Sequence, residues 1–198
     1  MIISLIGFMG CGKSSVGRKL SQLLCCPFID LDEAVEEVAG KRIPEIFASE
    51  GEAAFRRLET QILKDILSAE HERQYTSCEV GGVNEIPMTI SAVLALGGGT
   101  VMTPECAEMV RENTYCIYLM ASVNTLLERL SSNTSNRPLL TRDPHAALQG
   151  AQRRGNPSLH SRIDELMSQR SSTYEKTANI IIDTDGKSIE QICSEILC

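Results

Sequence analysis

The chain has 198 residues, of which 42% are hydrophobic and 23% are charged, and its formal net charge is -7. This composition is typical of a soluble globular protein with enough chain for one domain and a sizeable core. The negative charge argues against a general nucleic-acid binder and against a protein that binds anionic membranes, because both are normally basic. A small anionic ligand stays compatible with it, since a local group of arginines can override the mean charge.

We expect neither a membrane span nor a secretion signal. The sequence has no apolar run of the roughly 18 residues that a span needs, and its apolar N-terminus lacks a basic leader. The eight cysteines form no C-x-x-C pair, and no histidine lies near a cysteine pair, so zinc-site spacing is missing. Reduced thiols in a cytoplasmic protein are the expected outcome.

The first motif is GFMGCGKS at residues 7–14, which fits the pattern G-x-x-x-x-G-K-[ST]. An apolar, strand-like run at residues 1–6 precedes it, and apolar residues at helical spacing follow it. Strand, glycine-rich loop and helix are the setting in which this pattern binds a nucleoside triphosphate. Glycines let backbone N–H groups surround the phosphates, and the helix adds its positive end. A glycine-rich turn with an incidental lysine is the structural alternative.

This loop predicts specific contacts with ATP and Mg²⁺. Lys13 is expected to reach the β- and γ-phosphates, and the Ser14 hydroxyl is expected to bind Mg²⁺. The predicted ATP-binding residues of the loop are Gly10, Cys11, Gly12, Lys13, Ser14 and Ser15. We assign no catalytic role to the cysteine, because the variable positions of the loop tolerate many residues.

Two alternating carboxylates end the next apolar strand. Residues 28–32 read as that strand, and at period two Asp30 and Asp32 point to one face. Ligands of open α/β sheets bind at this end of the strands. One carboxylate can hold a Mg²⁺-bound water, and the other can accept a proton or a hydrogen bond from a hydroxyl nucleophile. The structural alternative is that Asp32 only caps a helix at residues 33–39.

A short helix and then a strongly amphipathic helix are predicted between residues 43 and 67. Arg56 and Arg57 stand near the start of the second helix, where a cation opposes the helix dipole. A substrate carboxylate accounts for one of them. The alternative is that both are solvated and paired with Glu52 or Glu59.

Residues 71–87 are predicted to form a polar loop, and a buried strand follows at residues 93–96. That strand runs into Gly97, Gly98 and Gly99. Three glycines at the carboxyl end of a strand let backbone amides approach a ligand closely, although a flexible turn is the simpler interpretation.

The rest of the chain continues the alternation of helices and strands. The predicted elements are a helix from Pro104 to about Arg111, a strand at 115–120, a helix capped by Ser122, a helix near 159–177, a strand at 179–183 and a last helix opened by a capping box at Ser188 and Gln191. The long polar stretch after residue 131, which contains Arg137, is the best candidate for a mobile lid. The alternation predicts one parallel three-layer α/β domain.

Together these motifs identify a family. Besides the loop at 7–14, they are Asp30-Leu31-Asp32, Gly51-Glu52-x-x-Phe55-Arg56, Gly97-Gly98-Gly99, Arg137-Pro138-Leu139-Leu140 and the pair Arg170 and Tyr174. In this order and spacing, the whole chain resembles the shikimate kinases, within the nucleoside-monophosphate-kinase-like branch of P-loop kinases. The resemblance implies a three-layer α/β/α P-loop kinase fold with a central parallel five-stranded sheet and a mobile lid. It implies a single domain over residues 1–198, with a substrate-binding segment at about 32–67 and a lid at about 131–158.

The resemblance also implies a reaction, in which the γ-phosphoryl group of ATP passes to the 3-hydroxyl of shikimate with the help of Mg²⁺. Lys13, Asp32 and Arg137 are then the catalytic residues. Asp32 binds the shikimate hydroxyls and orients or deprotonates the nucleophile, and Arg137 binds the phosphates of ATP as the lid closes. Ser14 and Asp30 support Mg²⁺.

For the acid substrate, the resemblance implies a pocket made by two arginines and a glycine loop. Its residues are Asp32, Arg56, Gly97, Gly98, Gly99 and Arg170, and the two arginines hold the shikimate carboxylate. Arg129 is placed against adenine. The expected protein is a cytoplasmic monomer whose partner is the small-molecule substrate, with no nucleic acid and no membrane. Two segments, 71–93 and the one between Arg137 and Arg170, are longer than is usual in the family.

Two rival interpretations stay open. A related small-molecule kinase, such as a gluconate kinase, would use the same arginines for a different acid. A regulatory module that binds a nucleotide without catalysis is the alternative from another class, although the presence of Lys13, Asp30, Asp32 and Arg137 argues against it.

Overall fold

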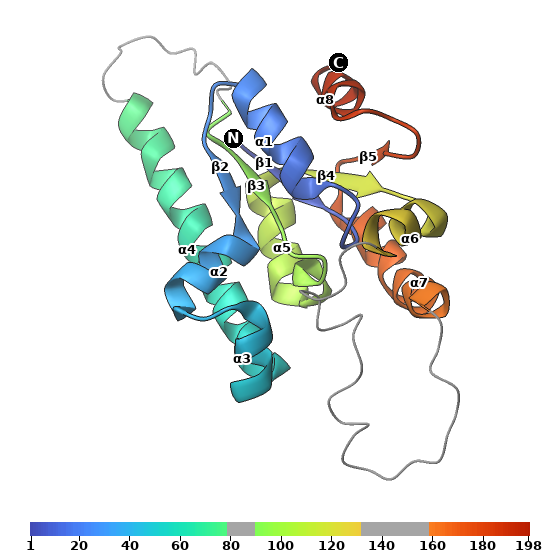
Figure 1. Ribbon diagram of the computed structural model, residues 1–198. Coiled ribbons are helices and arrows are strands. Elements are labelled where there is room, and N and C mark those ends of the chain that lie inside the picture. Colours follow the sequence, from blue (N-terminus) through green and yellow to red (C-terminus); the bar gives the residue numbers. More distant parts are fainter. Residues whose placement is uncertain (79–89, 132–158) are drawn as a thin grey trace.

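The computed structural model describes residues 1–78, 90–131 and 159–198, and gives the backbone alone for residues 70–78 and 131. Its centre is a five-stranded sheet in which every neighbouring pair of strands is parallel, in the order β2-β3-β1-β4-β5 (Figure 1). The strands are β1 (Ile2–Ile6), β2 (Phe28–Asp30), β3 (Ala92–Ala95), β4 (Thr114–Met120) and β5 (Ile180–Asp183). The predicted parallel sheet of five strands is therefore confirmed.

Helices cover both faces of this sheet (Figure 1). They are α1 (Lys13–Leu23), α2 (Leu31–Ala39), α3 (Ile43–Ser49), α4 (Glu52–Cys78), α5 (Pro104–Asn113), α6 (Val123–Ser131), α7 (Leu159–Thr177) and α8 (Ile189–Leu197), with a 3-10 turn, η1, at Thr100–Met102. The three-layer α/β arrangement follows the sequence prediction, because strands buried on both faces need helices on each side. None of the helices within the described ranges combines the length and apolarity needed to cross a bilayer.

The core is divided into two apolar clusters by the sheet itself. Successive side chains of β1 point to opposite faces, so Ile2 and Ile6 join one cluster while Ile3 and Leu5 join the other. The first cluster draws on α2, α3, α4 and α5, and the second on α1, α6 and α8. Helix α7 serves both clusters, and Tyr174 is its contribution to the first.

Helix α4 is longer than the sequence indicated. We expected a polar loop from residue 71, but the helix continues to Cys78. The apolar periodicity ends at Leu67, whereas residues 68–78 contain neither glycine nor proline and include the helix-favouring residues alanine, glutamate, arginine and glutamine. Helix propensity therefore carries the helix past the end of its buried face. The remainder of the predicted loop, residues 79–87, lies outside the described residues.

The connection from β2 to α2 also differs from the expectation. The strand ends at Asp30 and the helix begins at Leu31, so Asp32 belongs to the first turn of α2. The side chain of Asp30 accepts a hydrogen bond from the Asp32 amide at 3.1 Å. Asp30 is therefore the helix cap, and the alternative that gave this role to Asp32 is wrong. The caps at Ser122 and Ser188 are confirmed, since each hydroxyl accepts a backbone N–H in the first turn of its helix.

Candidate functional site

A cleft of about 840 Å³ lies where the carboxyl ends of β1, β2 and β3 meet. Most of the predicted site residues line it, namely Gly10, Cys11, Gly12, Lys13, Ser14, Ser15, Asp30, Asp32, Arg56, Gly97, Gly98 and Gly99. Arg129 lines it too. Arg170 contacts the wall of the cleft through Gly98. Arg137 and the proposed lid beyond Ser131 lie outside the described residues.

The loop after β1 has the backbone that a phosphate site requires. A Cβ atom at Gly7, whose φ is +140°, would stand 2.5 Å from the Leu119 carbonyl oxygen. Gly12 has a φ of +105° and immediately precedes α1. Both positions therefore demand glycine. The Lys13 ammonium donates to the carbonyls of Gly7 at 2.9 Å and Phe8 at 3.1 Å, so it lies against the loop that the motif assigns to the phosphates.

The hydroxyl of Ser14, at the start of α1, lies beside the carboxylate of Asp30, at the end of β2. The Ser14 hydroxyl donates to one carboxylate oxygen of Asp30 at 2.7 Å. The other oxygen accepts the Asp32 amide, which fixes the carboxylate. In the described part of the chain no group of three or more His, Cys, Asp or Glu side chains is arranged to hold a metal. A hydroxyl and one carboxylate beside a phosphate loop fit Mg²⁺, which keeps several waters and takes substrate phosphates as ligands.

Asp32 is a half-buried carboxyl group that lines the cleft, and its acidity is altered. Burial, followed by the charge of Asp30, raises the pKa of Asp32 to about 6, while the positive charges of Lys13 and Arg56 lower it. Asp32 is thus within electrostatic reach of both the phosphate loop and the candidate acid-binding arginine. A group that changes protonation near neutral pH suits proton transfer.

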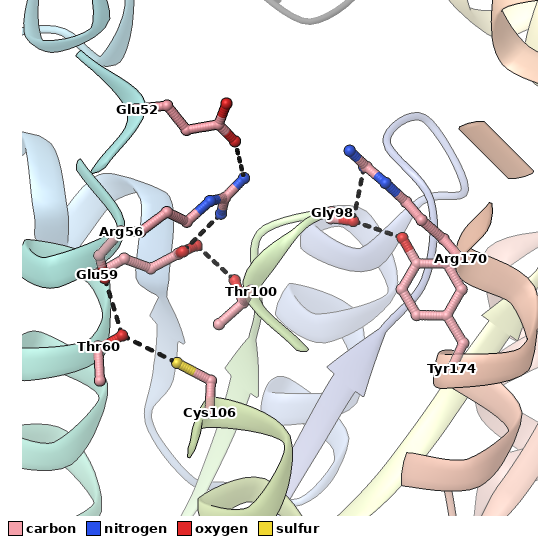
Figure 2. A network of polar contacts seen from close by, with 9 residues as sticks. All are labelled: Glu52, Arg56, Glu59, Thr60, Gly98, Thr100, Cys106, Arg170 and Tyr174. Carbon is pink, nitrogen blue, oxygen red and sulfur yellow. Dashed lines mark hydrogen bonds and ion pairs between the residues drawn. The ribbon is translucent and has the colours of Figure 1, made fainter. Parts of the chain in front are cut away.

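Arg56 is held on the wall of the cleft by two carboxylates. One of its terminal nitrogens donates to Glu59 at 2.6 Å, and the other contacts Glu52 at the looser distance of 3.5 Å (Figure 2). The pairing that we considered as an alternative is therefore present. It does not make Arg56 a solvated residue, however, because its side chain is only 20% exposed. Arg57, in contrast, is exposed.

Sequence reasoning did not find the hydrogen bond that Glu59 accepts from Thr100. This carboxylate is 1% exposed, and its second oxygen accepts the Thr100 hydroxyl at 2.6 Å (Figure 2). Its pairing with Arg56, three residues earlier on the same helix, was the alternative considered from the sequence. The link to Thr100 has no local signal, since it joins residues 41 positions apart.

The glycine loop after β3 is shaped by close packing against these charged groups. A Cβ atom at Gly97 would stand 2.7 Å from a carboxylate oxygen of Asp32. One at Gly99 would stand 2.6 Å from a terminal nitrogen of Arg56. The loop therefore has functional side chains directly against its backbone, which is a tighter requirement than a flexible turn would impose.

Arg170 lies on the other side of this loop from Arg56 (Figure 2). Its guanidinium donates to the Gly98 carbonyl at 3.2 Å, and the hydroxyl of Tyr174 donates to the same oxygen. The residue is 9% exposed. No carboxylate of the described residues pairs with it. A buried guanidinium whose positive charge is matched by no carboxylate within the described ranges suits an anionic ligand.

Arg129 ties the phosphate loop to the turn after β5. It donates to the carbonyls of Cys11 at 3.1 Å and Thr184 at 3.4 Å. These contacts place it at the cleft beside the phosphate loop. Its predicted contact with adenine stays a prediction.

Comparison with known proteins gives a consistent result. The family model described as shikimate kinase matches residues 9–72 and 63–198. The shikimate kinase of Marinomonas sp. (strain MWYL1) is 36% identical over 196 residues, covering 98% of this chain and 89% of the relative. A solved shikimate kinase from Acinetobacter baumannii, in complex with shikimate, is 28% identical with a TM-score of 0.77, and the match covers 99% of this chain and 90% of that one.

A second solved structure, the shikimate kinase of Aquifex aeolicus, is 30% identical with a TM-score of 0.70, and the match covers 100% of this chain and 94% of that one. Family model, sequence relatives and solved structures thus agree over nearly the full length of the chain. The chain belongs to the shikimate kinase family.

Proposed function

We propose that the chain transfers the γ-phosphoryl group of ATP to the 3-hydroxyl of shikimate, a step of chorismate and aromatic amino-acid biosynthesis. Membership of the shikimate kinase family supports the reaction. The observation that carries it in the structure is the position of Asp32, a half-buried carboxyl group that lines one cleft together with Lys13 and Arg56. The positive charges of Lys13 and Arg56 both lower its pKa. A hydroxyl group held at Asp32 lies between a phosphate site and a carboxylate site.

The phosphate side of the cleft would hold ATP. The backbone amides of Gly10, Gly12 and Lys13 surround the phosphates in this proposal, and the Lys13 ammonium exchanges its carbonyl partners for phosphate oxygens. Ser14 and Asp30 would hold Mg²⁺, which supplies positive charge against the phosphate oxygens. We also assign Arg137 to the phosphates, on the resemblance alone.

The acid side of the cleft would hold shikimate. Arg56 and Arg170 bind its carboxylate in this proposal, since a guanidinium matches a carboxylate in charge and geometry. The backbone of Gly97, Gly98 and Gly99 lines the ring. The Glu59 carboxylate already holds Arg56 in place, so little freedom of that side chain is lost on binding.

Asp32 would then act on the nucleophile. Its carboxylate accepts a hydrogen bond from the 3-hydroxyl and takes its proton as the new oxygen–phosphorus bond forms and the bond from the γ-phosphorus to the β-phosphate oxygen breaks. Phosphoryl transfer depends mainly on positioning and charge stabilisation. For this reason the alignment of the hydroxyl by Asp32 matters at least as much as its basicity.

We further propose a single-domain monomer in the cytoplasm. Free thiols are carried by Cys11, Cys25, Cys106, Cys116, Cys193 and Cys198, as a reducing compartment favours. Light scattering during gel filtration tests the oligomeric state, and a mass near 21.7 kDa is expected for the monomer.

The test of function is a coupled ADP-release assay with shikimate, quinate and gluconate side by side, followed by NMR of the product. We expect turnover with shikimate at least about 100-fold above that with gluconate, because exact placement of a carboxylate and a hydroxyl is required. Phosphorylation of gluconate without that of shikimate would favour the gluconate kinase alternative. Tight ATP binding without any turnover would favour the regulatory module.

A further inference from the structure

We propose that Tyr174 is a positioning residue for the acid-binding side of the cleft. Its hydroxyl fixes the peptide between Gly98 and Gly99 and, through the shared carbonyl, the guanidinium of Arg170. This inference rests on the proposed function, because it assigns Tyr174 to the binding of the shikimate carboxylate.

The geometry brings two hydrogen-bond donors to one oxygen atom. Arg170 and Tyr174 are one turn apart on α7 and therefore share a face of the helix. Both donate to the Gly98 carbonyl, the guanidinium at 3.2 Å and the phenol by a short hydrogen bond (Figure 2). A carbonyl oxygen has two lone pairs, so it can accept both bonds at once.

Tyr174 is confined to this role by its surroundings. Its side chain is 0% exposed, and its ring packs on Tyr118 with the centroids 5.1 Å apart. Burial raises the pKa of Tyr174 well above its usual value, so the phenol stays protonated and remains a donor at physiological pH. A buried hydroxyl needs an acceptor for its hydrogen, and among the described residues the Gly98 carbonyl fills that role.

The peptide that Tyr174 contacts has little orientation of its own. Glycine permits many more backbone conformations than other residues, so a peptide plane between two glycines must be fixed from outside. In a trans peptide the C=O and the following N–H point in opposite directions. With the Gly98 carbonyl turned toward α7, the Gly99 N–H points away from it, toward the side of the loop where Figure 2 places Arg56.

The shared acceptor also explains how Arg170 can engage a ligand. If its guanidinium turned toward a substrate carboxylate, the Gly98 carbonyl would lose one bond and keep the bond from Tyr174. The peptide would stay in place, and no buried carbonyl would be left without a donor. Tyr174 therefore lowers the cost of recruiting Arg170 while it keeps the peptide between Gly98 and Gly99 in place.

The test is Tyr174→Phe, which removes one oxygen atom and keeps the packed ring. We expect the KM for shikimate to rise about 3- to 10-fold, the range that one net hydrogen bond corresponds to. The KM for ATP should stay within about twofold, because the hydroxyl that is removed bonds to the glycine loop at the Gly98 carbonyl.

Tyr118→Phe is the matched control. It removes the hydroxyl from the neighbouring buried ring, and that hydroxyl interacts with Ser171. Thermal unfolding should report similar losses of stability for both variants. Only Tyr174→Phe should change the KM for shikimate, and only it should shift the Gly99 amide resonance in glycine-labelled protein.

A double-mutant cycle with Arg170→Ala completes the experiment. Because both side chains act through one carbonyl and one ligand group, the effect of Tyr174→Phe on shikimate binding should fall by half or more when Arg170 is absent. An unchanged KM for shikimate in Tyr174→Phe, or full additivity with Arg170→Ala, refutes the positioning role and leaves the proposed function standing. A wild-type protein that neither binds nor phosphorylates shikimate refutes both.

Discussion

At the scale of single residues, the raised pKa of Asp32 suits proton transfer but makes the folded protein less stable when Asp32 is ionised. In an unfolded chain its carboxyl group has the ordinary pKa of 3.8, whereas in the folded protein the pKa is about 6. Between these two values the folded protein binds the proton more tightly than the unfolded chain does. Ionisation of Asp32 therefore lowers the free energy of unfolding as the pH rises from about 4 to about 6, and the loss is complete above that.

Asp32→Asn should remove this loss together with the activity. We expect the free energy of unfolding at pH 8 to increase by up to about 2–3 kcal/mol, since one pKa unit corresponds to about 1.4 kcal/mol. The gain should shrink as the pH falls from 6 toward 4. Urea unfolding at pH 4.5 and pH 8 measures it, and Asp65→Asn on the exposed side of α4 is the control. A gain that is equal at both pH values contradicts the assignment.

At the scale of elements, the glycine loop after β3 joins the separate parts of the site. Gly97 lies against Asp32, Gly98 against Arg170 and Tyr174, and Gly99 against Arg56. The loop comes from the middle of the chain, yet its contacts come from α2, α4 and α7. A small change in its backbone therefore acts on several functional side chains together.

Gly97→Ala should disturb this packing more than a glycine substitution at an open position would. Its Cβ atom would stand 2.7 Å from an Asp32 oxygen, 2.9 Å from the Thr100 hydroxyl and 3.0 Å from a Glu59 oxygen. We expect kcat to fall about tenfold or more, with a loss of about 1–3 kcal/mol in stability from overpacking. Calorimetric titration should find ATP affinity nearly unchanged. Normal turnover with shikimate would contradict this prediction, because it would mean that the loop backbone can shift without displacing Asp32.

The elements also show which features sequence reasoning can reach. The strand, loop and helix around residues 7–14 were predictable because the motif and the apolar periodicity are both local. The strand order, with β1 between β3 and β4, places the phosphate loop at the centre of the sheet. That Asp30 and Asp32 line one cleft was expected, but the reason differs, since the first ends a strand and the second opens a helix.

Other features depend on tertiary contacts and leave no local pattern. The bond from Thr100 to Glu59 spans 41 positions, and the contact of Tyr174 with Gly98 spans 76. The extension of α4 was missed because its apolar stripe ends before the helix does. Periodicity reports buried faces, so it cannot show where a solvated helix stops.

At the scale of the whole molecule, the cleft is a meeting point of three strand ends and several helices. The phosphate loop follows β1, Asp30 ends β2, the glycine loop follows β3, and Arg56 projects from α4. In a parallel sheet all carboxyl ends lie at one edge, so residues distant in sequence are brought together without long loops. The proposed reaction needs this assembly, because its two substrates must meet at one aspartate.

The most direct measurement of the central claim compares two neighbouring arginines. Arg56→Ala removes the guanidinium that lies in the cleft, whereas Arg57→Ala removes an exposed one. We predict that Arg56→Ala raises the KM for shikimate by about 10- to 100-fold and leaves that for ATP nearly unchanged, as expected for a charge-assisted bond to the substrate carboxylate. Arg57→Ala should change neither constant. A higher KM for ATP with an unchanged KM for shikimate in Arg56→Ala would contradict the account.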